Sequence, residues 1–415
     1  MYQPNTVWQF ATAASIKFGR GCRYQLLDQL RLHGLSRPIV VLDATIRGLP
    51  LVSELLDSLA TFPDVQSDGG LISKITATVF DGCKPEPTID TALAACTAAV
   101  QTGADCVIGI GGGSNLDVAK ITAVVARYGG QPSDYFGFDR VPGPVLPLFA
   151  LPTTAGTGSE VSHSAVLTDV EQAVKVSTLS RWLRPTCAMV DPALTDSCPR
   201  TVTAHSGIDA LVHAIEAYTN RDYSQMVNVD PQARAYEGSY PLTRLFAAEA
   251  IRLIGQSLVI ACDHPHDKAA RDAMSLAAML AGMAFSNSGV GIVHALEYPI
   301  GAATHVGHGE GNGLLLPHVM RYNLPIRVAE FADIARWLGM NVVGLNHRQS
   351  AEAAIEAVVE LQHSIGIRTR LSEIGLARES IPEMAAKAFE IKRLMDINPQ
   401  TVQLSDLESI LASAY

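Results

Sequence analysis

A cluster of glycines between an apolar run and a helical pattern is the feature that most limits how this chain can fold. Residues 106–110 read Cys-Val-Ile-Gly-Ile, and Gly111, Gly112 and Gly113 follow directly. Residues 114–120 then have the spacing of a helix. A continuous apolar strand is typical of a parallel sheet that is buried on both faces. The order strand, glycine turn, helix therefore predicts an α/β fold built on a parallel sheet.

The glycine turn also predicts a binding site for phosphate. Glycines let the backbone approach a pyrophosphate closely, and the free amides at the start of the next helix stabilise its charge. The alternative is a tight turn with a structural role only. Ser114, with Asp117 three residues later, has the spacing of a capping box at the start of this helix.

A second loop, rich in hydroxyls and glycine, follows the apolar run near Phe149. In a dinucleotide-binding fold such side chains suit contacts to phosphate and to the nicotinamide amide. The loop could equally be a plain connection between two elements. Its candidate residues for cofactor binding are Thr153, Thr154, Thr157 and Ser159.

Asp43 stands at the carboxyl end of another apolar run, residues 38–42. An acidic residue at such a strand tip can bind the adenosine ribose hydroxyls and repel an extra phosphate, which selects NAD over NADP. Asp43 could equally cap the helix that follows it. Further strands are predicted at residues 76–80 and 188–190, and helices at residues 52–60 and 88–102.

Asp209 and His213 lie four residues apart in the apolar helical pattern of residues 206–216, so their side chains share one face. A divalent cation could satisfy both buried polar groups, although ordinary hydrogen bonds could also do so. His294 and His308 extend the pattern to one carboxylate and three imidazoles. Such a set suits iron(II), zinc, cobalt or manganese better than calcium or copper(I).

Helical patterns dominate after Pro199, and strand signals largely disappear. We therefore expect a Rossmann-like α/β dinucleotide-binding domain over residues 1–198 and an all-helical domain over residues 199–415. A cleft between them is expected to hold the metal beside the cofactor. Helices of the second domain are predicted at residues 245–260, 268–284, 328–338 and 351–365.

The whole pattern resembles the iron-dependent alcohol dehydrogenase family over nearly its full length. The resemblance rests on the glycine string of residues 111–120, on residues 152–161 and on the histidine segments; residues 162–164 depart from it, so His163 has no assigned role. It implies a dehydroquinate synthase-like fold, NAD and iron(II) (or zinc) as cofactors, and a homodimer. It also implies that the metal ligands are Asp209, His213, His294 and His308, and that the cofactor loop includes Gly111, Gly112, Gly113, Ser114 and Asp117.

Tyr298 lies one turn after His294 on the same face, and Pro299 is expected to end that helix. Many family members have a histidine at this position. A phenol titrates near pH 10 against about 6.5 for imidazole, so Tyr298 would be a poor proton shuttle and a better hydrogen-bond donor. It is a candidate catalytic residue, with simple packing as the alternative. His305 competes with His308 as a ligand, but His308 fits the family's His-Gly pattern.

Composition limits the partners and the compartment. The net charge of −10 argues against a nucleic-acid surface. Seven cysteines without Cys-x-x-Cys spacing favour reduced thiols and the cytoplasm. Residues 1–19 do not predict a signal peptide. The apolar stretch of residues 277–296 contains polar interruptions, so a buried helix and loop are expected and not a membrane span.

The predicted function is hydride transfer between a small alcohol, or its aldehyde or ketone, and NAD(H), with the metal polarising the substrate oxygen. Residues 221–240 resemble an insertion of the hydroxyacid-oxoacid transhydrogenase branch and could form a lid, a dimer contact or a surface loop. Transhydrogenation with tightly held NAD is therefore one alternative. A dehydroquinate synthase-like lyase that uses NAD transiently is another. A metallohydrolase is disfavoured, because it would leave the glycine loops without a purpose.

Overall fold

The computed structural model describes residues 7–61, 65–67, 70–72, 74–172, 174–226 and 235–415. The chain forms two compact units. The first, called the α/β unit below, contains Thr12–Thr154 and Ser159–Ser197. The second, called the helical unit, contains Cys198–Tyr415, the short segment Ala155–Gly158 and N-terminal residues up to Ala11.

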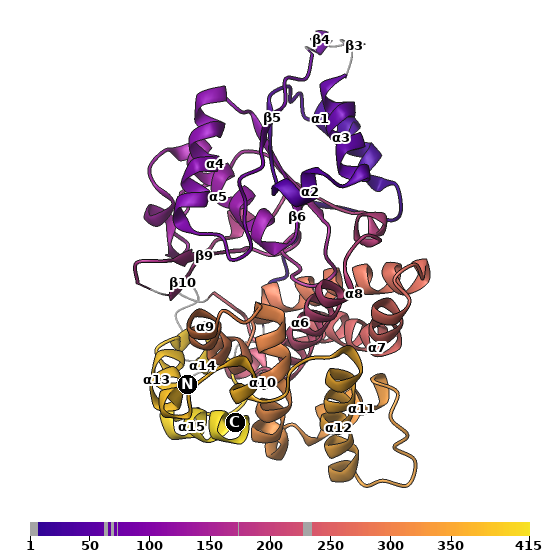
Figure 1. Ribbon diagram of the computed structural model, residues 1–415, viewed down its shortest axis with the longest axis vertical. Helices are drawn as coiled ribbons and strands as arrows, with labels where there is room; N and C mark the ends of the chain where they lie inside the picture. Colours follow the sequence, from indigo (N-terminus) through magenta and orange to yellow (C-terminus); the bar gives the residue numbers. More distant parts are fainter. Residues whose placement is uncertain (1–6, 62–64, 68–69, 73, 173, 227–234) are drawn as a thin grey trace. The chain divides into compact units, whose positions relative to one another are not determined.

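A six-stranded parallel sheet is the centre of the α/β unit (Figure 1). Ile39 and Val41 of β2 pack into one apolar cluster, and Val40 of β2 and the next residue, Leu42, pack into another. Both faces of the sheet are therefore buried, which explains the continuous apolar run. In spatial order the strands are β1 (Ser15–Phe18), β11 (Cys187–Val190), β8 (Leu148–Pro152), β6 (Cys106–Gly111), β2 (Pro38–Val41) and β5 (Thr78–Phe80).

Helices cover both faces of this sheet. Helices α4 (Ile89–Thr102) and α5 (Gly113–Tyr128) share an apolar cluster with Ile39, whereas α1 (Leu26–Leu32) and α3 (Pro50–Ala60) share one with Val40. Figure 1 shows the two pairs on opposite sides of the sheet. The predicted Rossmann-like α/β fold is confirmed, and a short helix, α2 (Ala44–Arg47), follows β2 directly.

Two smaller sheets are missing from the sequence prediction. One has the order β7 (Gly137–Phe138), β10 (Val174–Leu179), β9 (Ser164–Asp169), and the other pairs β3 (Val65–Ser67) with β4 (Gly70–Ile72). In β10 apolar and polar residues alternate over residues 174–177. This alternation is typical of a strand with one exposed face, and a search for continuous apolar runs does not find it.

The described residues of the helical unit form helices around one apolar core, with α6 inside it. From Gly207 to Thr219 every residue of α6 is buried, because α7, α8 and α10 pack against it. The unit contains α6 (Arg200–Thr219), α7 (Pro241–Asp263), α8 (Lys268–Ser288), α9 (Ile292–Thr304), α10 (His308–Asn323), α11 (Val328–Trp337), α12 (His347–Ile365), α13 (Ile381–Phe389), α14 (Lys392–Asp396) and α15 (Leu404–Ser413). The four helices predicted in this half are confirmed as α7, α8, α11 and α12.

Pro299 lies inside α9, so the prediction that it ends the helix is wrong. A proline inside a helix removes one backbone hydrogen-bond donor and usually destabilises the helix by about 3 kcal/mol. Helix α9 packs against α10, α13 and α14, and its residues Ile292 to Glu297 are buried. Tertiary packing on this scale outweighs the local cost of the proline.

The ends of the 221–240 segment lie close together. The Tyr223 amide donates to Ser239 O at 2.9 Å, and the Ser239 amide donates to Arg221 O at 2.8 Å. Residues 227–234, on which the hypothesis of a lid or dimer contact depends, lie outside the described residues. The hypothesis therefore stays open.

Among the described helices, α7 alone has the length and hydropathy of a membrane-crossing segment; α8 and α9 have them only when joined, across a bend of 103°. Buried helices in the core of soluble proteins share these properties. In α7, 44% of the most apolar window is buried.

Candidate metal and cofactor sites

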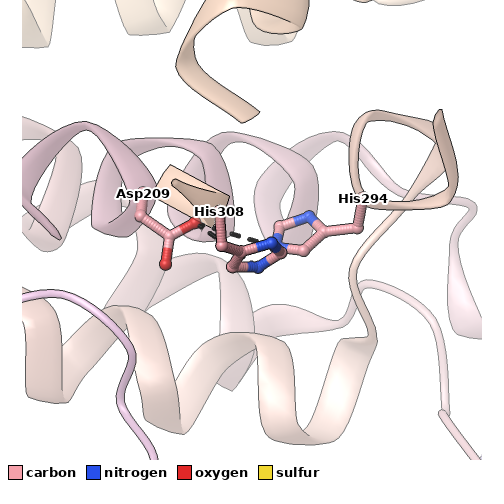
Figure 2. Close-up of side chains that lie close together, drawn as sticks. All are labelled: Asp209, His294 and His308. Atoms are coloured by element: carbon pink, nitrogen blue, oxygen red, sulfur yellow. Dashed lines mark ion pairs between the residues drawn. The ribbon is translucent and has the colours of Figure 1, made fainter. Parts of the chain in front are cut away.

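Three of the four predicted metal ligands meet in the helical unit. The ligand atoms of Asp209, His294 and His308 lie within 4.8 Å of one another, and Figure 2 shows the side chains turned toward one another. The Nε2 atoms of His294 and His308 each lie 4.0 Å from Asp209 Oδ1. His213 lies beside this group: its Nδ1 is 3.9 Å from Asp209 Oδ2, and its ring stacks on His294 with centroids 4.8 Å apart.

Three glycines allow α10 to approach its neighbours closely enough to bring His308 to this place. A Cβ atom on Gly309 would lie 2.1 Å from the carbonyl oxygen of His205 on α6. A Cβ atom on Gly313 would lie 2.8 Å from the Ile208 side chain, and one on Gly311 would lie 2.9 Å from Cγ of Glu297. The glycines in the string that follows His308 therefore have a packing reason.

Burial and mutual charge set the protonation of the group. Burial lowers the pKa of His213 to about 3, so its ring is neutral, which is the form that binds metals. Burial by itself would raise the pKa of Asp209. The neighbouring His213, His308 and His294 outweigh this effect and hold the Asp209 pKa below its usual range.

The group fits a divalent cation. His213 Nδ1 and His294 Nε2 are buried and have no hydrogen-bond partner among the described residues. A buried polar atom without a partner costs about 1–3 kcal/mol, and a cation would satisfy both nitrogens. Two bonds of about 2.0–2.2 Å to one ion can span separations such as those between Asp209 and the three rings. One carboxylate and three imidazoles suit iron(II) and zinc.

Sequence reasoning missed three polar residues around the group. His294 Nδ1 lies 2.6 Å from Glu216 Oε2, and His308 Nδ1 bonds to Glu297 Oε2. The Asn312 side chain donates to Asp209 Oδ1 at 2.8 Å. A signal was available for the glutamates, because each stands three residues after a predicted ligand in a His-x-x-Glu pattern.

Tyr298 lies near His308, with ring centroids 6.0 Å apart. Burial raises the pKa of Tyr298 above its ordinary value of 10, so the phenol stays protonated near neutral pH. His305 is exposed and ends α9 with a φ of 56°, and it is not part of the ligand group.

The glycine turn joins β6 to α5 in the α/β unit. Gly111 has a φ of 143°, and a Cβ atom there would lie 1.9 Å from the Asn115 side chain, so glycine is required. Helix α5 begins at Gly113, with Gly112 as an N-cap that makes no side-chain hydrogen bond. The predicted capping box of Ser114 and Asp117 is therefore wrong. Amides of the first turn that no side chain caps suit phosphate binding.

Asp43 lies beside this turn and has two partners. Its Oδ1 accepts a hydrogen bond from the Ile46 amide at 2.9 Å and so caps α2. Its Oδ2 accepts a hydrogen bond from the Asn115 side-chain amide at 2.9 Å. The capping alternative is confirmed, and it leaves the cofactor role open because a carboxylate oxygen can accept more than one hydrogen bond.

The second loop lies next to the glycine turn. A Cβ atom on Gly112 would lie 3.4 Å from the Thr154 hydroxyl oxygen. The Thr153 amide donates to Gly111 O at 3.0 Å.

Two predicted cofactor residues, Asp117 and Ser159, bond to each other inside the α/β unit. Ser159 Oγ donates to Asp117 Oδ1 at 2.7 Å and accepts from the fully buried Lys120 at 2.8 Å. Lys120 also donates to Ser162 Oγ and to Ser164 O. This network holds the second loop in place. Thr157 belongs to the helical unit.

A parallel doubly wound sheet with a glycine turn, together with a helical unit in which Asp209, His294 and the half-buried His308 meet, is typical of the class of metal-dependent, dinucleotide-using oxidoreductases. Residues 13–192 match the family described as iron-containing alcohol dehydrogenase. Residues 234–415 match the C-terminal part of the Fe-containing alcohol dehydrogenase family.

Individual relatives agree over the full length. The NAD-dependent methanol dehydrogenase of Bacillus methanolicus is 34% identical over 405 residues, which are 98% of this chain and 99% of that protein. Lactaldehyde reductase of Escherichia coli K12 is 31% identical over 404 residues, covering 96% and 97%. The solved structure of an alcohol dehydrogenase from Oenococcus oeni superposes with a TM-score of 0.89 at 31% identity, covering 99% of this chain and 100% of that chain.

This chain belongs to the iron-containing alcohol dehydrogenase family. The predicted enzyme class is thereby confirmed: it is an oxidoreductase that interconverts alcohols with aldehydes, with NAD(H) and iron as cofactors. The transhydrogenase and lyase alternatives are not favoured.

Proposed function

We propose that the enzyme holds iron(II) at Asp209, His213, His294 and His308 and acts there on a small alcohol or its aldehyde. The observation that carries this proposal is the group of buried Asp209, buried His294 and half-buried His308, in which His294 Nε2 has no hydrogen-bond partner among the described residues. Zinc is the alternative metal, because the same donors bind both ions. A small substrate is supported by relatives that are named for methanol and lactaldehyde.

We propose that the NAD pyrophosphate binds at Gly111, Gly112 and Gly113, with Ser114 in the same turn. Asp43 would accept the adenosine ribose hydroxyls beside it, and Thr153 and Thr154 would complete the loop. Asp117, Thr157 and Ser159 complete the proposed set of cofactor residues, and the bond between Ser159 and Asp117 also holds the second loop in place.

When bound, the metal supplies a positive charge that polarises the substrate oxygen, and NAD accepts the hydride. The chain's own residues position these groups. Asp209 supplies the negative charge that retains the cation, and Asn312 holds its carboxylate in one orientation. Tyr298, kept protonated by burial, would donate a hydrogen bond and would not carry protons.

Tyr298→Phe should therefore lower kcat and leave the shape of the kcat–pH profile near neutrality unchanged. An unchanged kcat would mean that Tyr298 only packs at this position.

Removal of single imidazoles tests the ligand set. His294→Ala and His308→Ala should each abolish stoichiometric metal binding and alcohol oxidation with NAD, measured by metal analysis and NADH absorbance after anaerobic reconstitution with iron(II). His305→Ala is the matched control, because this histidine is exposed and lies outside the group. A His308→Ala protein that still binds one metal ion would refute the assignment.

We also propose that the enzyme works in the cytoplasm as a homodimer. The seven cysteines are not joined in disulfides and six of them are buried, which suits a reducing compartment. Light scattering of the purified protein at micromolar concentration tests the dimer, and a monomer mass would contradict it.

A further inference from the structure

Two buried glutamates stand behind the histidines of the candidate metal site. Glu216 Oε2 lies 2.6 Å from His294 Nδ1, and Glu297 Oε2 bonds to His308 Nδ1. The exposed fractions of the two glutamates are 5% and 0%. In both rings Nδ1 is therefore engaged by a carboxylate, while Nε2 lies 4.0 Å from Asp209 on the opposite side.

The pairs connect three helices in series. Glu216 lies on α6, three residues after His213, and holds the histidine of α9. Glu297 lies on α9, three residues after His294, and holds His308 at the start of α10. Each His-x-x-Glu segment thus provides one candidate ligand and fixes the ligand of the next segment.

Glu216 fixes the backbone of α9 as well as its histidine. Its Oε1 accepts the Val293 amide at 2.8 Å, in the first turn of the helix, where Gly291 makes no side-chain cap. A Cβ atom on Gly291 would lie 2.9 Å from this oxygen, so glycine leaves the space that the carboxylate occupies. A negative charge at a helix N-terminus is favourable. One carboxylate therefore sets both the start of α9 and the orientation of the His294 ring.

The two carboxylates favour one tautomer of each ring. When ionised, a carboxylate only accepts hydrogen bonds, so Nδ1 then carries the proton and Nε2 presents its lone pair. A negative partner on Nδ1 also makes Nε2 a stronger donor toward a metal. Asp209 alone would leave a divalent ion with uncompensated charge in a buried site, which is costly. The two glutamates place two further negative charges one ring away.

We propose that Glu216 and Glu297 are positioning residues that set how tightly this site holds its metal, acting through His294 and His308. The inference rests on the proposed metal site. It goes further by assigning metal retention to two residues that are not themselves ligands.

The test measures zinc affinity by competition with a chromophoric chelator for Glu216→Gln and Glu297→Gln. Glutamine keeps the size and an acceptor oxygen but removes the charge. Each variant should bind zinc about 10–100-fold more weakly than the wild type. Glu160→Gln is the matched control, because Glu160 is also buried but lies in the α/β unit, and its zinc affinity should equal that of the wild type.

Cobalt(II) substitution gives a second readout that a general loss of stability would not produce. The visible d–d spectrum of each glutamine variant should shift from that of the wild type, while the spectrum of the Glu160→Gln protein should not. Affinities within twofold of the wild type together with unchanged spectra would overturn the inference. A wild-type protein that binds neither zinc nor cobalt stoichiometrically would instead refute the proposed metal site itself. Each glutamate contacts a different histidine, so one folded variant is enough for a decision.

Discussion

At the scale of single residues, Asp43 shows how one side chain can serve two purposes. It caps α2 through the Ile46 amide, and it accepts the Asn115 side chain beside the glycine turn. The cap explains why an acidic residue suits this position in the fold. The place of the carboxylate, next to the proposed pyrophosphate loop, is the reason to expect an effect on cofactor choice.

Asp43→Gly separates these two roles. Glycine at an N-cap costs only a few tenths of a kcal/mol, and the lost hydrogen bond from the Asn115 side chain should cost about 0.5–1.5 kcal/mol more. Removal of the charge that repels a 2′-phosphate should raise the ratio of kcat/KM for NADP to that for NAD by about tenfold, equivalent to about 1.4 kcal/mol. Initial rates with both cofactors measure the ratio. A ratio equal to that of the wild type would count against the role.

Glu160 gives a prediction about pH. Burial raises the pKa of Glu160 from 4.5 to about 7. A hydrogen bond to its own backbone and the positive charge of Lys120 act in the opposite direction and are outweighed. Between these two pH values the folded protein binds more protons than the unfolded chain, so stability falls as pH rises through this window.

Glu160→Gln should remove this part of the pH dependence. The melting temperature of the variant should fall less than that of the wild type between pH 4.5 and pH 7, and calorimetry of the metal-free protein measures the difference. Parallel curves for the two proteins would show that Glu160 does not titrate in this window.

At the scale of elements, glycines decide how closely segments pack. Gly158 has a φ of 61°, and a Cβ atom there would lie 2.4 Å from the Cα atom of Gly282 on α8. Gly156, two residues earlier, lies in the same way against Ser206 of α6. The segment Ala155–Gly158 therefore packs into the helical unit through contacts that only glycine permits.

Gly158→Ala should be clearly more destabilising than Gly339→Ala. Both glycines have positive φ, at 61° and 88°, but no atom lies within 4 Å of the Cβ position at Gly339. The backbone strain alone should cost about 1–2 kcal/mol at either site, and the clash at Gly158 should add about 1–3 kcal/mol. Urea unfolding measures both variants. Equal losses in the free energy of unfolding would show that α8 shifts to make room for the Cβ atom of residue 158 at no energetic cost.

At the scale of the whole molecule, the candidate metal site connects three helices that are distant in sequence. Asp209 and His213 come from α6, His294 from α9 and His308 from α10. A ligand that binds only the folded form stabilises it according to its free concentration. Metal binding should therefore stabilise the helical unit as a whole.

Metal removal should lower the melting temperature by about 5–10 °C relative to protein at a free metal concentration about 100 times Kd. Thermal scans with chelator, and again after zinc is restored, measure the effect. The His308→Ala protein should melt at the same temperature in both conditions. A metal-dependent shift in that variant would show that the ion binds elsewhere.

Local patterns in the sequence were sufficient for much of this description. The apolar strand, three glycines and helix of residues 106–120 predict a parallel α/β sheet, because periodicity and glycine conformation act over a few residues. The four-residue spacing of Asp209 and His213 predicts that they share a helix face for the same reason. The prediction that the helix ends at Pro299 is wrong, because the helix continues through packing against α10, α13 and α14, which are formed by other segments of the chain.

Tertiary structure alone decided which groups meet. The pairing of Glu216 with His294 joins residues 78 positions apart, and that of Asn312 with Asp209 joins residues 103 positions apart. The internal partners of Asp117 and Ser159 also come from outside their own segments. Such contacts depend on how closely whole helices and loops approach one another. That approach is fixed by the packing of many side chains at once, and short-range sequence spacing does not encode it.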